Sequence, residues 1–539
     1  MGSKLSPHAR QHLELARGYT RKARPERPEN TAPVSRELPV LPPPVPKTDT
    51  APRPPERDTG SDRGAENRLL SGGVAHPSST PAAKRVFRNH KPRTTLVRQA
   101  PPTPAALLDG LPTGEEWLRV ILVGVLGDGT LDGLRRWATA ELREPWRHGS
   151  HYAEDPARPV LKFENTTSGQ RVTVIRASSW FGDDATSVDS VRDSWSQLDE
   201  LVAAGWSGAK LLDSPAGTGT DLFLRSIPKG REWPTPPSEV AELIRATSGQ
   251  GRIECCPADF TIPRLIENDG RLMYGGLCWS LPGAFVSDDD GPYVPFARAR
   301  YLVRVEVPAG WDHVGILGVK DSTGPWRYPS KPGEVFETWA DGSELAVASD
   351  HGWPFVVLRR LMFEEGKPLD KWAEQLVGLG LDESLPKLVR VGARAMLLHG
   401  LGSFTGRPRR LTRSVPLAEA ERVPPEAVDV RVEAGEMVYA VEERPRQPML
   451  VQPQWPAAVW GRARAALLDR PRLGVGALRL PRETVVAFRT DAIYTTEPTG
   501  WADDGKAGRF RVKSTREGPF PAPMSSADLL AIRDEGRAV

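Results

Sequence analysis

Hydrophobic and polar residues follow regular patterns from about residue 106 onward. Apolar residues recur at helical spacing over residues 131–142, 195–205, 238–247 and 385–400. β-rich runs predict a hairpin over residues 159–180 and a strand over residues 299–308, with residues 313–319 as its antiparallel neighbour. An apolar element ending in a Gly/Asp turn is expected over residues 115–130. Because helices and strands are mixed without a regular βαβ repeat, the pattern favours an α+β fold.

Residues 1–105 lack this periodicity. They hold 18 prolines and two aromatic residues, so they cannot bury enough apolar surface to fold, and we expect a disordered tail. The first 100 residues carry 19 Lys/Arg and 9 Asp/Glu, a net charge of +10, whereas the whole chain is only +3. A basic cluster includes Lys84, Arg85 and Arg88, and two interpretations remain open. The cluster contacts nucleic-acid phosphates without sequence preference, or it is a solvated linker.

The composition indicates a soluble protein. Of the 539 residues, 39% are hydrophobic and 26% charged, and no apolar run is long enough to span a membrane, so no membrane partner is expected. Three cysteines cannot form a disulfide framework and lack paired CxxC spacing, which fits a reducing cytoplasm. Arginine far outnumbers lysine, which indicates a GC-rich bacterial or phage genome and hence the cytoplasm of a bacterium or phage-infected cell.

The helix over residues 385–400 carries a stripe of like charges. Lys387, Arg390 and Arg394 recur at i, i+3 and i+7, without an acid among them. Ser384 is a candidate N-cap, and Pro386 suits the first helical turn. The stripe is either an ordinary solvated face or a binding surface for a triphosphate or a nucleic-acid backbone.

Two aspartates have local sequences that allow more than one interpretation. Asp491 separates two β-rich runs, so it lies at a hairpin tip either as turn chemistry or as a carboxylate for a hard cation such as Mg²⁺. Asp269 lies in the tripeptide Asn268-Asp269-Gly270, which by itself predicts a turn. Asp288, Asp289 and Asp290 lack the spacing of a calcium loop and are expected to form a solvated turn.

In chain order, these segments resemble motifs A, B and C of family B DNA polymerases, and most closely those of the protein-primed branch found in phages and linear plasmids. Motif A reads D-G-R-L-M-Y-G from Asp269, motif B reads R-A-M-L-L-H-G-L-G-S-F from Arg394, and motif C reads R-T-D-A-I around Asp491. Residues 370–372 (Asp-Lys-Trp) and 449–470 also resemble segments of that family. The likeness runs, with gaps, from about residue 210 to residue 500.

The resemblance implies a fold with a polymerase-like palm, helical fingers, a reduced thumb and a degenerate, inactive exonuclease-like α/β domain. The corresponding expected segments are the tail at 1–105, the exonuclease-like domain at 106–215, the palm at 216–365, the fingers at 366–410, the palm continued at 411–505 and a thumb remnant at 506–539. In the exonuclease-like domain only Asp132 is a candidate metal ligand, because Lys162 stands where an acid would precede Glu164.

The resemblance also implies roles for individual residues. Asp269 and Asp491 would hold two Mg²⁺ or Mn²⁺ ions, since both correspond to metal-binding aspartates. Tyr274 would lie under the sugar of the incoming dNTP and disfavour a 2′-hydroxyl. The cations Lys387, Arg390 and Arg394 would bind the triphosphate, and Lys371, Arg245 and Arg252 would contact DNA. The tail, including Lys84, Arg85 and Arg88, would contact a priming terminal protein or DNA.

Several departures from the family pattern bear on activity. Leu398 and Leu401 replace the Asn and Tyr of motif B, and Arg489 replaces the first Asp of motif C. The expected thumb is mostly missing, and we assign no primer-gripping role to Lys513. We therefore expect a template-directed DNA polymerase without proofreading. One alternative is a catalytically inactive, polymerase-shaped nucleic-acid-binding accessory protein, and another is a non-enzymatic interaction protein whose likeness arose by chance.

Overall fold

The computed structural model describes residues 94–149, 160–228, 231–256, 261–320, 326–406, 409–433, 436–443 and 447–534. All of them belong to one compact unit, residues 86–539. Most of the predicted tail, including Lys84, Arg85 and Arg88, lies outside the described residues. The predicted limit of the tail at residue 105 is wrong, because β1 (Thr94–Gln99) pairs in parallel with β2 (Trp117–Val123) and buries Val97.

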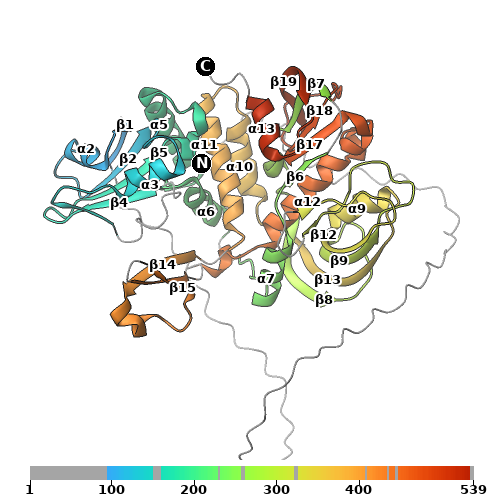
Figure 1. The fold of residues 1–539 in the computed structure, drawn as a ribbon, viewed down its shortest axis with the longest axis horizontal. Coiled ribbons are helices and arrows are strands. Elements are labelled where there is room, and N and C mark those ends of the chain that lie inside the picture. Colours follow the sequence, from blue (N-terminus) through green and yellow to red (C-terminus); the bar gives the residue numbers. More distant parts are fainter. Residues whose placement is uncertain are drawn as a thin grey trace, which may run out of the picture. The chain divides into compact units, whose positions relative to one another are not determined.

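The first sheet has the strand order β1-β2-β5-β4-β3 and includes the predicted hairpin, which is confirmed (Figure 1). Its remaining strands are β3 (Trp146–His148), β4 (Val160–Asn165) and β5 (Arg171–Arg176). One face packs on α2 (Pro104–Asp109) and α3 (Leu131–Thr139), and the other on α4 (Ser178–Phe181) and α5 (Val188–Gly205). Burial on both faces explains why β2 is apolar along nearly its whole length.

An antiparallel sheet with the order β19-β7-β18-β17-β6 gathers strands from distant parts of the chain. Its strands are β6 (Arg252–Cys255), β7 (Thr261–Gly270), β17 (Val485–Thr490), β18 (Ala492–Thr495) and β19 (Phe510–Pro521). The predicted hairpin at Asp491 is confirmed. The predicted turn at residues 268–270 is wrong, because pairing with β18 and β19 holds this segment in strand β7. Residues 506–539, expected as a thumb remnant, instead supply β19 and helix α13 (Ser526–Asp534).

Short helix α8 (Met273–Gly276) leads from β7 into a second antiparallel sheet, ordered β12-β9-β13-β8. Its strands are β8 (Leu281–Asp289), β9 (Arg298–Glu306), β12 (Val335–Asp341) and β13 (Phe355–Gly366), and α9 (Gly342–Asp350) follows β12. The strand predicted at 299–308 is confirmed, but its predicted neighbour is wrong. Residues 313–318 form an irregular buried segment, and only β10 (Val319–Lys320) pairs, with β11 (Trp326–Arg327). Asp288 and Asp289, expected in a solvated turn, end β8 and pair with Arg359 and Arg360.

The other predicted helices are confirmed. They correspond to α7 (Ser238–Thr247) and α11 (Lys387–Ser403). Helix α12 (Gln454–Leu468) lies within the segment 449–470, and α6 (Pro215–Ser226) and α10 (Asp370–Leu381) pack beside α11. Helix α11 takes Pro386, not Ser384, as its N-cap. α6 and α11 approach closely at Gly219, where an added Cβ would lie 2.3 Å from the Met396 carbonyl oxygen.

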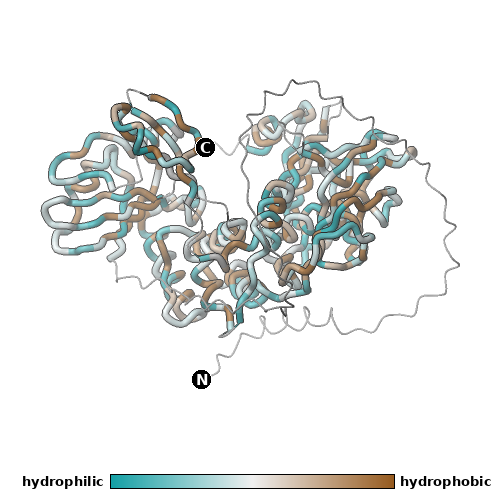
Figure 2. Tube along the Cα trace, turned by 90° about the horizontal axis from the view of Figure 1, so that it is seen from below, coloured by the Kyte–Doolittle hydropathy of each residue, from teal (hydrophilic) through white to brown (hydrophobic). Residues whose placement is uncertain are grey.

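Between α11 and α12 the chain forms a separate small sheet, where continued palm was expected. Its antiparallel strands are β14 (Arg409–Pro416), β15 (Val428–Glu433) and β16 (Glu436–Glu443). Figure 2 shows that hydrophobic and hydrophilic segments are interspersed along the described parts of the chain. Among the described residues, no helix is long and apolar enough to cross a membrane. The chain is thus a mixed α/β protein with several sheets.

Candidate active site

Strand pairing brings Asp269 and Asp491 together although 221 residues separate them in sequence. Asp269 lies near the end of β7 directly opposite Ala492 of β18, and Asp491 occupies the connection from β17 to β18. The Gly270 amide donates to the Asp491 carbonyl oxygen at 2.9 Å. Thr490, just before Asp491, has a φ of +59°, an uncommon value for a β-branched residue. The tight β17–β18 connection therefore places the Asp491 carboxylate beside that of Asp269.

Both carboxylates are buried and incompletely satisfied. Asp269 is 2% exposed and Asp491 6% exposed, and in each residue Oδ2 is buried without a hydrogen-bond partner. The Thr490 hydroxyl donates to Asp491 Oδ1 at 2.9 Å. Burial and the neighbouring Asp269 raise the pKa of Asp491, and Arg394 opposes that increase. A buried pair of like charges with open oxygen atoms is the arrangement that a bound cation would relieve.

Three cationic side chains surround the pair. An Arg394 guanidinium nitrogen lies 3.7 Å from Asp491 Oδ2, and one of Arg511 lies 3.6 Å from Asp269 Oδ2. The Lys513 ammonium lies 2.9 Å from Glu267 Oε1 and 3.4 Å from Asp269 Oδ1. Our sequence reasoning missed Arg511 and left Lys513 without a role. The signal was present in the alternation of cations at 509, 511 and 513, which indicates one face of a strand.

The donor set fits a hard divalent cation. Among the described residues, no three His, Cys, Asp or Glu side chains are grouped to hold a metal by themselves. Mg²⁺ is nevertheless commonly held by one or two carboxylates, with water and substrate phosphates completing its shell. The two open Oδ2 atoms of Asp269 and Asp491 supply those carboxylates. When a metal binds, the surrounding cationic side chains would have to move away from the carboxylates or turn toward substrate phosphates.

The residues predicted to bind the nucleotide divide into two groups. Arg394 and Tyr274 lie at the aspartate pair: burial raises the pKa of the Tyr274 hydroxyl, and Asp491 raises it further. Arg390 lies one turn earlier on α11, half-buried, with Nε lacking a partner. Lys387 is directed elsewhere, because its ammonium lies 2.9 Å from Asp184 Oδ2. The basic stripe of α11 thus extends from the aspartates to the segment after α4.

The residues predicted to contact DNA have different surroundings. Lys371 is exposed in the first turn of α10. Arg245 Nε donates to the Thr405 carbonyl oxygen at 2.8 Å, just beyond the end of α11. Arg252 is fully buried, with its guanidinium 3.9 Å from the centre of the Tyr328 ring, and is paired with Glu254. Arg252 is therefore inaccessible to a nucleic acid, and the structure corrects the prediction that it contacts DNA.

The acids considered in the exonuclease-like region are paired with arginines. Asp132, in the first turn of α3, lies 3.4 Å from Arg135. Glu164, on β4, pairs with Arg147 and Arg171, and its hydrogen bonds to both lower its pKa. These two acids belong to separate ion pairs.

Comparison with known proteins adds a similarity of fold. No protein-family model matches the chain, and no curated protein does. Among solved structures, phi29 DNA polymerase in an orthorhombic crystal form matches at 12% identity with a TM-score of 0.50, over 74% of this chain and 76% of that one. The same polymerase complexed with primer-template DNA matches at 13% identity and a TM-score of 0.49, over 74% and 76%. The chain thus has a polymerase-like fold, similar to that of phi29 DNA polymerase.

Proposed function

We propose that the chain is a template-directed DNA polymerase of the protein-primed family B type. The observation that carries this proposal is the pair Asp269 and Asp491, which are buried on adjoining segments of one antiparallel sheet with open carboxylate oxygens. The fold similarity to a DNA polymerase supports it. A basic helix on one side of the pair and a basic strand on the other suit a polyanionic substrate.

We also propose a role for each side chain of the site. Asp269 and Asp491 would hold two Mg²⁺ or Mn²⁺ ions. When bound, the ions supply Lewis-acid stabilisation to the attacking hydroxyl and to the leaving phosphate oxygens. Arg394, already at the pair, and Arg390, one helical turn away, would bind the triphosphate of the dNTP. Tyr274, buried beside Asp491, would pack under the sugar.

The remaining parts of the proposal concern the partners. Lys371 is exposed and would contact the template, whereas Arg245 is already engaged by a backbone carbonyl and would act by fixing the end of α11. The tail, with Lys84, Arg85 and Arg88, would contact a priming terminal protein or DNA. With Asp132 and Glu164 in separate arginine pairs, we propose that the chain does not proofread.

One observation favours a second function, a polymerase-shaped protein that binds nucleic acid without synthesis. The register places Arg489 opposite Ala492, which itself lies opposite Asp269, so Arg489 lies on the sheet face that carries Asp269. Together with Arg394, Arg511 and Lys513 it makes this face rich in cations, which favours phosphate binding with or without metal.

The two functions are separated by dNTP incorporation on a primed template, and without primer, in the presence of Mg²⁺ or Mn²⁺. We expect incorporation by the wild type and its loss in Asp491→Asn, because the amide removes one of the two metal-binding charges. Asp290→Asn, which changes an exposed acid after β8, serves as the matched control and should retain activity. Label transferred to protein would identify protein priming. Template binding without incorporation, with or without primer, would reject the polymerase in favour of the second function, a scaffold that binds nucleic acid without synthesis.

A further inference from the structure

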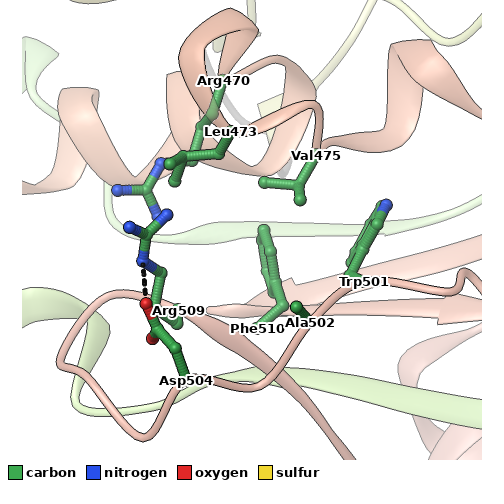
Figure 3. A pocket seen from close by; sticks show the side chains of 8 residues that line it. All are labelled: Arg470, Leu473, Val475, Trp501, Ala502, Asp504, Arg509 and Phe510. Carbon is green, nitrogen blue, oxygen red and sulfur yellow. Dashed lines mark ion pairs between the residues drawn. The ribbon is translucent and has the colours of Figure 1, made fainter.

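A small cavity lies at the start of β19 (Figure 3). Its volume is about 120 Å³, whereas small-molecule sites have roughly 300–1,000 Å³. Its Arg509 is paired with Asp504 at 3.3 Å, and its Arg470 already donates to the Gly508 carbonyl oxygen. The cavity is therefore too small, and its cations too fully engaged, to hold a nucleotide, which would need a more open surface.

Two large aromatic side chains lie on the surface around the second antiparallel sheet. Trp279, just before β8, is 57% exposed, and Phe296, in the turn before β9, is 85% exposed. Among the described residues, they are the tryptophan and the phenylalanine that the fold leaves mainly in water. Because burial of such rings is strongly favourable, two of them exposed on neighbouring segments indicate a binding surface.

The backbone at both rings adopts a left-handed conformation. Phe296 has a φ of +64°, and Ser280, directly after Trp279, has a φ of +49°. A hydrogen bond of 3.2 Å closes the turn 294–297, in which a proline precedes Phe296. Turns with a positive φ at the third position favour glycine or asparagine there. The chain thus accepts backbone strain to display a bulky ring to solvent, and such strain is typical of functional positions.

Two arginines fix the segments that carry the rings. The Arg462 guanidinium lies 5.0 Å from the centre of the Trp279 ring and donates to the Ser280 carbonyl oxygen at 2.7 Å. The Arg298 guanidinium donates at 2.7 Å both to the Phe296 carbonyl oxygen and to the Ser280 hydroxyl. One guanidinium thus joins the two segments into one surface. Since Arg462 lies over one face of the Trp279 ring, the opposite face is left for a flat partner.

Exposed lysines border the Trp279 ring. The amide of the residue after Trp279 donates to Asp370 Oδ1 at 3.3 Å, which places the start of α10 beside it. Lys367 and Lys371, both exposed, flank Asp370 in sequence, and the charge of Lys367 opposes the rise in the pKa of Asp370 that burial causes. Glu365 lies 3.4 Å from one of the two arginines. Together with the arginines, these residues supply four positive and two negative charges, which favours an anionic partner.

From the exposed rings and the lysines we infer that this surface binds a single strand of nucleic acid. Its bases stack on Trp279 and Phe296, and its phosphates lie at Lys367 and Lys371. Every base has a flat face, so the surface does not select a sequence. An apolar protein partner would leave the lysines without a role, whereas a strand uses both features. The inference extends the proposed function but does not require catalysis, because an inactive scaffold would present the same surface.

Fluorescence anisotropy of labelled oligonucleotides tests the inference on the full chain. A short thymidine strand is compared with an abasic strand of the same length, which keeps the phosphates and lacks the bases. EDTA is present throughout, so that metal-dependent binding at the aspartates does not contribute. We expect the thymidine strand to bind about tenfold more tightly, because only its bases can stack. Equal affinity for the two strands would overturn the inference.

Substitutions separate the contribution of the bases from that of the phosphates. Trp279→Ala should weaken binding of the thymidine strand about tenfold and leave the abasic strand unaffected, and Trp279→Phe, which keeps a ring, should lose less. Lys371→Gln should weaken both strands by the same factor and reduce the salt dependence, because it removes a phosphate contact. Val125→Ala truncates an apolar side chain of similar exposure, 68%, in the loop after β2 and should bind both strands as the wild type does.

Two results with the ring variant would overturn the inference. Unchanged thymidine binding by Trp279→Ala would leave the exposed rings to a protein partner. Equal weakening of both strands would show that the ring acts on the structure and not on the bases. The proposed polymerase is judged separately, by dNTP incorporation. Failure of incorporation together with selective loss of thymidine binding in Trp279→Ala would reject the polymerase and support this surface.

Discussion

Replacing Asp491 with asparagine should stabilise the protein while removing its proposed activity. The Asp491 carboxylate is 6% exposed, has an Oδ2 without a hydrogen-bond partner and lies beside Asp269. Burying the charge of this carboxylate beside a like charge, against the partial compensation by Arg394, costs about 1–3 kcal/mol, a penalty that a neutral side chain does not carry. The substitution Asp491→Asn keeps the shape of the side chain and removes its charge, so the free energy of unfolding should rise by an amount within that range.

The pH dependence of this effect has a definite sign. Burial and Asp269 raise the pKa of Asp491 above its ordinary value of 3.8, so the folded protein holds the proton to higher pH than the unfolded chain. The free energy of unfolding of the wild type therefore falls progressively as the pH rises from about 3.8 to the raised pKa. Above the raised pKa this loss of stability is complete. The variant and the wild type should be nearly equal in stability at the acid end of this window and differ most at about pH 8.

Thermal unfolding in EDTA measures how far the substitution stabilises the protein, and thermal unfolding in Mg²⁺ measures how far the metal stabilises each protein. With about 2.1 cal/mol/K of unfolding entropy per residue, 1 kcal/mol corresponds to about 1 °C for a chain of this length. In EDTA at neutral pH the variant should melt about 1–3 °C above the wild type. Mg²⁺ at a hundred times its Kd should add about 2.7 kcal/mol to the wild type alone and reverse the order. A variant that is less stable in EDTA, with an equal response to Mg²⁺, would refute the reasoning.

Three further substitutions test the packing around the site. Arg464→Met should lower the free energy of unfolding by about 3–5 kcal/mol, because the buried Glu344 carboxylate, which accepts hydrogen bonds from Arg464 at 2.7 and 2.8 Å, loses its cationic partner. Chemical denaturation measures this loss, and adding Glu344→Gln to the same chain should restore part of it. Lys513→Met should destabilise by about 1–3 kcal/mol because it removes the ammonium from buried Glu267, and a loss no larger than that of an exposed lysine would contradict the pairing. Gly219→Ala should lower the melting temperature by forcing α6 from the α11 backbone, and an unchanged melting temperature would contradict the close approach.

Local sequence patterns predicted the helices and hairpins well, because those elements depend on nearby residues. The helix at 238–247 has the predicted bounds, and the hairpin tip at Asp491 lies where the β-rich runs meet. The failures came from long-range pairing. Residues 268–270 have strong turn chemistry, but β18 and β19 supply hydrogen-bond partners on both sides and hold them extended.

The charged residues of the site were only partly predictable. The order of the motifs along the sequence pointed to Asp269, Asp491 and Arg394, and the structure brings these three side chains together. Arg252 illustrates the limit: its sequence context suits a surface cation, yet the rings of Tyr328 and Phe488 enclose it. Whether an arginine is buried depends on aromatic residues far away in the chain, and no local pattern reports them.

The charge balance around Asp269 and Asp491 distinguishes the two proposed functions. Three acids, Glu267, Asp269 and Asp491, meet four cations, Arg394 from α11, Arg489 from β17, and Arg511 and Lys513 from β19, so the site has a small excess of positive charge before any ligand binds. A metal ion that binds there adds positive charge, and the arginines and Lys513 then need a new anionic partner. A nucleotide triphosphate or a phosphate backbone supplies it. Metal and phosphate should therefore bind cooperatively in an active polymerase, whereas a scaffold would bind phosphate most tightly in the absence of metal.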